Sequence, residues 1–258
     1  MKISLFYYSG AGNTKFIAKK ISTVLKSNSC SVSMTRVMKN SVVDIEEESD
    51  LYIVGFPIYD LTTPSLVKDL LETLKKKNKP IAFFCTKAFA SADSIKELSD
   101  IQGFQTVGVM ELYMPATDAL LIFAKKDSST EKIVKYFHSR NIDKKVSHFV
   151  KTLLKHQEVK VAKKWYVNLS FLIPQNFKDK FHAQYSKYVP DFYSQPDICI
   201  ECMKCVKECP RENIIFDENI KFGLDCDMCL HCVHHCPTDS IQIGSLTQGN
   251  VRYTKVQL

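Results

Sequence analysis

Eight of the ten cysteines in this chain of 258 residues fall within one short stretch. They form two runs with the spacing C-x2-C-x2-C-x3-C-P, and the second run starts 27 residues after the first. The eight cysteines are Cys199, Cys202, Cys205, Cys209, Cys226, Cys229, Cys232 and Cys236. Three thiolates so closely spaced can bind three corners of an iron–sulfur cube before the chain turns away at the proline. The stretch therefore predicts iron–sulfur chemistry.

The two runs belong to a duplicated unit, because residues 199–214 align with residues 226–241 and share every cysteine, a valine, the proline and an isoleucine. Over residues 196–245 the chain resembles bacterial-type two-cluster ferredoxins, in which the fourth cysteine of each run ligates the cluster of the other run. The resemblance implies two [4Fe–4S] clusters. Their ligands would be Cys199, Cys202, Cys205 and Cys236 for one, and Cys226, Cys229, Cys232 and Cys209 for the other.

Zinc sites and disulfides are the alternatives for these cysteines. Zinc sites usually draw on separated pairs of ligands, not on three cysteines within seven residues. The second run also contains His231, His234 and His235. Because a cysteine already serves every cluster corner, we expect these rings on a solvated helix face. Ferredoxins of this type usually have glycine after the second cysteine, where this chain has Met203 and Leu230. We expect this departure to affect the local backbone geometry and the reduction potential of the clusters rather than their ligation.

A second candidate site is the segment Ser9-Gly10-Ala11-Gly12-Asn13-Thr14, which follows an apolar stretch and opens a helical pattern. Backbone N–H groups at a helix N-terminus, together with the Ser9 and Thr14 hydroxyls and the Asn13 amide, form a cradle for a phosphate dianion. A dinucleotide fingerprint would need a third glycine where Lys15 stands, and a Walker loop would need Gly-Lys-Ser/Thr. A glycine-rich turn without a ligand remains the alternative.

Strand-like and helix-like stretches alternate through the first 156 residues. Strands are predicted at residues 3–8, 51–56, 81–85 and 106–112, and an alternating pattern predicts another at residues 31–37. Helical patterns lie at residues 13–27, 64–74 and 94–99, and a last amphipathic helix or pair of helices at residues 130–155. Five strands alternating with helices predict an α/β fold, a doubly wound parallel sheet covered on both faces.

The phosphate loop after the first of five strands resembles the FMN phosphate loop of flavodoxins, although Ala11 stands where a third hydroxyl residue is usual. The resemblance covers most of residues 1–156 and implies that the flavin ring lies beyond the C-terminal ends of strands three and four. Tyr59 is the first choice for stacking on the ring and Phe89 the second, with core packing as the alternative for Phe89. The full set of candidate ring contacts is Pro57, Ile58, Tyr59, Thr86, Lys87, Ala88 and Phe89. Cys85, at the end of a strand, is interpreted as packing rather than chemistry.

Three domains are therefore expected: a flavodoxin-like FMN-binding domain at residues 1–156, an aromatic and basic connector at 157–195, and a small α+β ferredoxin domain with a tail at 196–258. The net charge is +7, but residues 196–258 hold six Lys and Arg against nine Asp and Glu, which makes −3. Each cluster with four thiolates adds about −2. Because the cofactors would cancel most of the positive excess, we expect no nucleic-acid partner.

The N-terminal apolar run is too short for a signal peptide, and no apolar stretch approaches the roughly 20 residues of a membrane span. A cytoplasmic protein without a membrane span is expected, and ten cysteines in that compartment favour metal or redox chemistry over structural disulfides.

The whole chain resembles proteins, known mainly from anaerobic microbes, that fuse a flavodoxin-like FMN domain to a two-cluster ferredoxin. The resemblance implies a carrier that passes low-potential electrons between the clusters and FMN and exchanges them with redox partner proteins of ferredoxin or flavodoxin type. Two alternatives stay open: an FMN-dependent reductase of a small acceptor fed by ferredoxin, and a redox sensor. The carrier is favoured because no acid–base constellation stands out near the predicted ring.

Overall fold

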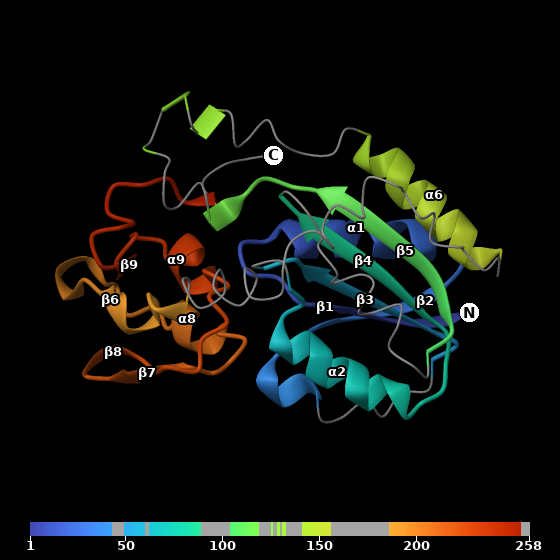
Figure 1. Cartoon of the computed structure of the whole chain (residues 1–258), viewed down its shortest axis with the longest axis horizontal. Helices are drawn as coiled ribbons and strands as arrows, with labels where there is room; N and C mark the ends of the chain where they lie inside the picture. The colour runs from blue at the N-terminus through green and yellow to red at the C-terminus, as the bar shows by residue number, and fades with distance from the viewer. Residues whose placement is uncertain are drawn as a thin grey trace, which may run out of the picture. The chain divides into compact units, whose positions relative to one another are not determined.

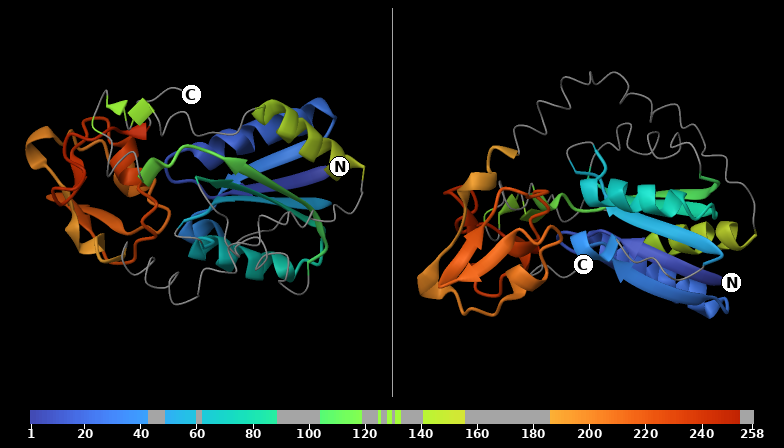
Figure 2. Two further views of the ribbon diagram at one scale, coloured as in Figure 1. Left: turned by 45° about the horizontal axis from the view of Figure 1, so that its top comes forward. Right: turned by 90° about the horizontal axis from the view of Figure 1, so that it is seen from below.

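The computed structural model describes residues 1–42, 49–59, 62–88, 104–118, 125, 128–129, 131–132, 141–155 and 186–253. The chain divides into two compact units (Figures 1 and 2). The first comprises Met1–Ser9, Asn13–Met114 and His138–Pro174, and the second Gly10–Gly12, Pro115–Phe137 and Gln175–Leu258. The helix expected at residues 94–99, the residue Phe89 and most of the expected connector lie outside the described residues.

The first unit is built on a five-stranded sheet with the order β2-β1-β3-β4-β5, and every pairing in it is parallel. The strands are β1 (Lys2–Tyr7), β2 (Ser31–Arg36), β3 (Leu51–Pro57), β4 (Ile81–Lys87) and β5 (Thr106–Tyr113). All residues of β3 and β4 are buried, as expected of central strands in a parallel sheet covered on both faces. The predicted doubly wound sheet is confirmed, and its strand order is the flavodoxin-like one.

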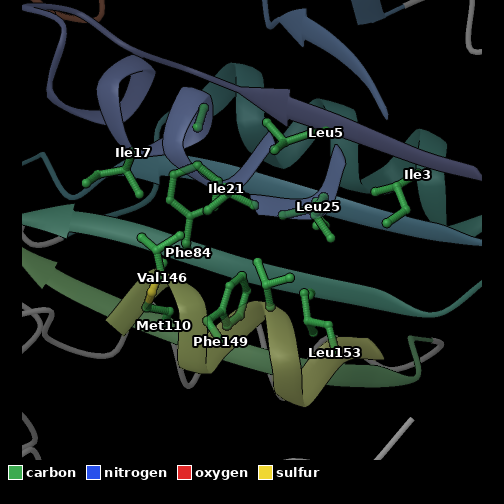
Figure 3. Close-up of a cluster of buried hydrophobic side chains, with 14 of the residues drawn as sticks. Ile3, Leu5, Ile17, Ile21, Leu25, Phe84, Met110, Val146, Phe149 and Leu153 are labelled. Atoms are coloured by element: carbon green, nitrogen blue, oxygen red, sulfur yellow. The ribbon is translucent and has the colours of Figure 1, made fainter. Parts of the chain in front are cut away.

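Helices cover both faces of this sheet (Figure 1). On one face, α1 (Asn13–Ser27) and α6 (Ile142–Leu154) bury their apolar sides against the strands, and Figure 3 shows Ile17, Ile21 and Phe149 pointing into that layer. On the opposite face, α2 (Ser65–Lys75) buries its own apolar stripe. Burying one such side chain contributes about 1.5–3 kcal/mol, so the three stripes account for much of the unit's stability.

Close packing inside the sheet explains one glycine of β3. A Cβ on Gly55 would lie 1.9 Å from the ring carbon Cζ of Phe84, its register partner on β4. The Phe84 ring therefore fills the space over Gly55, and any side chain there would displace the ring from the core.

The second unit is a small α+β structure. Its antiparallel pairs are β6 (Phe192–Ser194) with β9 (Ile241–Ile243), and β7 (Ile214–Asp217) with β8 (Asn219–Phe222). Two short helices, α8 (Lys204–Lys207) and α9 (His231–His235), follow the second cysteine of each run. Its apolar core is formed by Phe192, Leu230, Val233, Cys236, Ile241 and Ile243.

The N-terminal side of this unit begins before residue 196, the boundary expected from the sequence. Phe192 is buried in the core, and β6 pairs with β9 across almost fifty positions of sequence. A strand of three residues gives no readable periodicity, so the sequence alone assigned it to the connector. None of the described helices is long and apolar enough to cross a membrane.

Candidate functional site

Two pockets in the second unit are each lined by four cysteines. One, with an empty volume of about 340 Å³, is lined by Cys199, Cys202, Cys205 and Cys236. The other, of about 400 Å³, is lined by Cys209, Cys226, Cys229 and Cys232. We call them the first and the second cysteine pocket. Each takes three thiols from one run and the fourth from the other run.

All ten cysteines are free thiols, and four thiols facing one pocket are the donor set that a [4Fe–4S] cluster requires. Among the described residues, no group of three or more His, Cys, Asp or Glu side chains is arranged to hold a single metal ion. The four cysteines that line each pocket fit a cluster that binds one thiolate at each of its four irons.

Both runs hold their cysteines on the same backbone conformation. Met203 and Leu230 have φ of 56° and 58°, which is the left-handed conformation that glycine adopts without steric cost. Met203 and Leu230 therefore keep the backbone conformation that glycine would adopt, at a steric cost to folding of about 1–2 kcal/mol at each position. Two further pairs, 27 residues apart, share this conformation: Glu201 with Met228, and Glu212 with Asp239.

These left-handed residues are suited to an anionic ligand. The right-handed helices α8 and α9 start directly after Met203 and Leu230. Where left-handed and right-handed residues adjoin, successive backbone N–H groups form a concave surface that binds anions, including iron–sulfur clusters. Thus the backbone, as well as the thiols, fits a negatively charged group in each pocket.

The thiols differ in how readily they become thiolates. Burial raises the pKa of Cys205 and of Cys226 to about 11, and also raises that of Cys232. Burial acts in the same direction on Cys236, but hydrogen bonds from Ser240 and Thr238 outweigh it and leave the pKa of Cys236 below its ordinary value. Iron ligation requires thiolates, so assembling the clusters must release protons.

The fourth cysteines of the two runs also differ in their hydrogen bonds. The Cys236 sulfur lies 3.3 Å from the Ser240 hydroxyl and 3.7 Å from the Thr238 hydroxyl. The Cys209 sulfur instead accepts the backbone N–H of Asn213 at 3.4 Å. Asn213 is the repeat counterpart of Ser240, so the two runs stabilise equivalent sulfurs by different donors.

Two of the three histidines are buried, so the expectation of a solvated helix face is wrong for them. His231 is 5% exposed, and both of its ring nitrogens have partners within the second unit. Nε2 lies 2.7 Å from Glu208 Oε2, and Nδ1 lies 2.8 Å from the carbonyl oxygen of Gly10. His234 is fully buried and accepts the backbone N–H of Tyr253 at 3.2 Å. The partners come from distant parts of the sequence, which is why the local pattern did not reveal them.

The predicted phosphate loop lies between β1 and α1, as expected. The Ser9 hydroxyl accepts the backbone N–H of Lys15 at 3.2 Å, and Gly12 has a φ of +114°, which favours glycine. The first turn of α1 contains no acidic residue, so no carboxylate of the helix itself offsets its positive end. The loop is thus suited to a phosphate dianion.

Thr14 has a second role that the sequence did not suggest. Its hydroxyl lies 2.9 Å from the Thr86 hydroxyl at the end of β4, and both side chains are buried. Because a hydroxyl can donate once and still accept, Thr14 can accept from Thr86 while donating to a ligand. The pair joins the start of α1 to the strand end where ring contacts were predicted.

The strand ends expected around the flavin ring are brought together in part. The Ile58 N–H donates to the Thr86 carbonyl at 2.9 Å, which ties the segment after β3 to β4. The half-buried Tyr59 ring lies 6.2 Å, edge on, from the buried ring of Tyr8, a residue that the sequence analysis did not select. Pro57 is buried, and Ala88 is partly exposed.

Lys87, another predicted ring contact, is engaged within the sheet. Its ammonium group lies 3.0 Å from Glu111 Oε2 and 5.1 Å from the centre of the Tyr113 ring, both on β5. Cys85 is 1% exposed, and burial raises its pKa far above the ordinary value, so it remains a thiol. This supports packing as the role of Cys85.

Comparisons with known proteins follow the same division of the chain. A family model described as "Flavodoxin domain" matches residues 4–100, and one described as "4Fe-4S dicluster domain" matches residues 191–237. A search of curated proteins found no match.

Solved structures similar to the chain include flavodoxins. A short-chain flavodoxin associated with a non-canonical PDU bacterial microcompartment is 13% identical, covers 60% of this chain and 97% of its own, and has a TM-score of 0.42. Oxidised flavodoxin 1 from Bacillus cereus is 19% identical over 61% of this chain and 99% of its own, with a TM-score of 0.41. Rubredoxin oxygen:oxidoreductase from Desulfovibrio gigas is 16% identical over 59% of this chain and 37% of its own, with a TM-score of 0.36.

Proposed function

We propose that this chain, in which a flavodoxin domain is fused to a 4Fe–4S dicluster domain, transfers electrons between two [4Fe–4S] clusters and FMN. The observation that carries the proposal is the pair of pockets, each lined by four cysteines. When bound, each cluster exchanges one electron at a time, whereas FMN exchanges one or two. The chain would thus link single-electron donors to a carrier of electron pairs.

In this proposal the two clusters are held by crossed ligand sets. Cys199, Cys202, Cys205 and Cys236 hold one cluster, and Cys226, Cys229, Cys232 and Cys209 hold the other. The left-handed residues beside the cysteines direct backbone N–H groups toward negative charge. Apolar neighbours such as Val233 and Ile241 keep water from the sulfurs and so favour a defined potential.

FMN belongs, in the same proposal, to residues 1–156. Its phosphate is held by Ser9, Gly10, Ala11, Gly12, Asn13 and Thr14. Its ring lies near the ends of β3 and β4, with Tyr59 as the stacking residue. The ferredoxin part begins near residue 191, where the family match starts, and the preceding segment from residue 157 connects the two domains.

The external donors and acceptors in this proposal are redox partner proteins of ferredoxin or flavodoxin type, because both matched domains are of kinds that exchange electrons. A cytoplasmic location is part of the proposal, since iron-ligating cysteines must be kept from forming disulfides.

The cofactor content of the anaerobically purified protein tests the proposal. We expect about eight iron atoms, eight acid-labile sulfides and one FMN per chain, because the ligand sets accommodate two clusters. Four irons per chain, or zinc in place of iron, would contradict the two-cluster assignment. A protein that reconstitutes with iron and sulfide but takes up no FMN would contradict the flavin part alone.

The phosphate loop is tested by replacing Asn13 and Thr14 together with Ala. Each lost hydrogen bond to the charged phosphate should cost about 1.5–3 kcal/mol, so FMN should dissociate during gel filtration while the iron content stays unchanged. Thr23→Ala is the control, because Thr23 lies on the same helix and its hydroxyl bonds only the carbonyl of Lys19. Unaltered flavin retention in the double variant would mean that the phosphate is held elsewhere.

A further inference from the structure

Arg252 is a buried cation in the C-terminal segment, beyond the residues that match the dicluster family model. Its side chain belongs to a residue only 2% exposed. An arginine is rarely so buried unless its charge is paired with a negative group and its nitrogens form hydrogen bonds. Its surroundings therefore bear on the electrostatics of the cysteine pockets.

A buried polar network fixes the guanidinium of Arg252. One nitrogen, Nη2, donates to Gln242 Oε1 at 2.9 Å and to the Ile241 carbonyl at 3.2 Å. Gln242 Oε1 in turn accepts the Thr247 hydroxyl at 2.7 Å, and Thr247 is fully buried. Because the network holds the side chain in one place, the positive charge has a defined position.

The charge of Arg252 is only partly compensated. Among the described residues, Arg252 forms an ion pair with Asp239, whose Oδ1 lies 3.6 Å from Nε and whose side chain is partly exposed. Nη1, the remaining nitrogen, has no hydrogen-bond partner among the described residues. A guanidinium paired with one partly exposed carboxylate and holding an unpaired nitrogen retains part of its field in a low-dielectric interior.

The cysteines are within reach of that field. Burial lowers the pKa of Arg252, while negative charge on Asp239, Cys236 and Cys232 raises it, in that order of strength. The geometry places Arg252 beside the first cysteine pocket, because the Ile241 carbonyl that Nη2 contacts belongs to a residue that lines this pocket together with Cys236. Cys232 lines the second cysteine pocket. Gln242 and Ile241, which hold the guanidinium, lie on the strand that follows Cys236.

The second cysteine pocket has a different electrostatic environment. Arg211 forms ion pairs with Asp225 and, at 3.8 Å, with Asp227, so two carboxylates offset one cation. The two carboxylates belong to the residues on either side of Cys226, which lines this pocket. This pocket therefore has excess negative charge beside its ligands.

We propose that Arg252 makes the cluster of the first cysteine pocket the more easily reduced of the two, so that a single electron entering the pair settles there. Reduction adds one negative charge to a cluster, and a fixed buried cation stabilises the reduced form. Arg252 acts as a positioning charge and not as a ligand. The inference rests on the proposed two-cluster function and adds an ordering of the two sites.

Redox titration of the full-length protein, followed by EPR, tests this ordering. In Arg252→Gln, the reduced-to-oxidised ratio of the first-pocket cluster should fall about tenfold at a given potential, which is 59 mV for a one-electron couple. The second-pocket cluster should shift less. Cys209→Ala, which removes a ligand of the second pocket, identifies the signal that belongs to the first pocket.

Two further variants separate charge from a merely structural role. Arg252→Lys keeps the cation and should restore most of the shift, whereas Asp239→Asn removes the partial counter-charge and should make the first-pocket cluster easier to reduce. Asn is also tolerated in the left-handed conformation of Asp239. Lys221→Gln removes an exposed charge of the same unit and should move either potential by less than about twofold because solvent screens it.

The possible results distinguish a failure of the inference about Arg252 from a failure of the proposed two-cluster function. With about eight irons in the Arg252, Asp239 and Lys221 variants, an unchanged first-pocket potential in Arg252→Gln, or an equal shift of both clusters, overturns the inference. If Arg252→Gln takes up no iron, Asp239→Asn decides: a raised first-pocket potential supports the inference, and an unchanged one overturns it. A wild-type protein with only about four irons would instead overturn the proposed function itself.

Discussion

The two cysteine repeats are alike within the motif and unlike around it. Both have the same spacing and the same left-handed backbone at three equivalent positions. Outside the motif, Cys236 has hydroxyl donors and a buried arginine nearby, whereas Cys209 has a backbone donor and a set of exposed or half-buried charges. Duplication thus accounts for the common ligand geometry. Differences at aligned positions, such as Asn213 and Ser240, and the later residue Arg252 make the two sites different.

Removing the fourth cysteine of one run should have the largest effect, because it takes a corner from the cluster of the other run. Cys209→Ala should lose the cluster bound by Cys226, Cys229 and Cys232, and Cys236→Ala the opposite one. In each case the iron content should fall from about eight to about four per chain. EPR of the reduced variants measures which signal remains.

Cys202→Ala supplies the reference for this comparison, because Cys202 lines the first cysteine pocket. It should lose the same EPR signal as Cys236→Ala. If Cys202→Ala and Cys209→Ala lost the same signal, each run would hold its own cluster and the crossed assignment would be wrong.

The left-handed residues after the second cysteines should respond differently to glycine. Leu230 is buried in the core of the second unit. Leu230→Gly should therefore lower the free energy of unfolding of this unit by about 2–4 kcal/mol, after relief of backbone strain is subtracted. Met203 is only partly buried, so Met203→Gly should be neutral or stabilising by up to about 1 kcal/mol. The temperature at which the cluster absorbance bleaches under anaerobic conditions measures both. Equal destabilisation would show that the repeats are equivalent in packing.

Removing the hydroxyl hydrogen bond to Cys236 should have a smaller effect, a change in the reduction potential of the first-pocket cluster. Ser240→Ala removes the donor at 3.3 Å and should make the first-pocket cluster a few-fold harder to reduce, because hydrogen bonds to sulfur stabilise the reduced form. Asn213→Ala is the matched variant in the other repeat. Since Asn213 donates to Cys209 through its backbone, that bond persists, and only the amide bonds of Asn213 to Gly223 and Asp225 are lost, so the second-pocket potential should shift less. Equal shifts in the two variants would contradict this distinction.

Removing Arg211 should have the smallest effect. Two carboxylates already offset its charge, and its partner Asp225 is exposed, so Arg211→Gln should make the second-pocket cluster about twofold harder to reduce. Raising the salt concentration should diminish the difference between Arg211→Gln and the wild type, because exposed charges are screened. The same salt series should leave the effect of Arg252→Gln largely intact, and a common salt dependence would count against the buried character of Arg252.

The central strands β3 and β4 could be predicted from the sequence because burial on both faces produces continuous apolar runs, whereas the exposed strand β2 was predicted from its alternating pattern. The flavodoxin-like parallel sheet was expected from the glycine-rich loop after the first of five strands, and the parallel pairing confirmed it. In contrast, β6 is three residues long and is formed only by pairing with β9, so its membership in the second unit required the tertiary structure.

The sequence by itself determined the ligand chemistry of this protein, because a cluster needs thiols at short, fixed intervals and such spacing is local information. It also predicted a phosphate loop, since hydroxyls, glycines and a helix start lie together in six residues, and the structure places these residues between β1 and α1. Only the tertiary structure decided which groups surround those sites: Arg252 near Cys236, the bond between Thr14 and Thr86, and the burial of His231. Those contacts join residues far apart in the chain, and because electrostatic and hydrogen-bond energies depend on distance in space, spacing along the sequence could not reveal them.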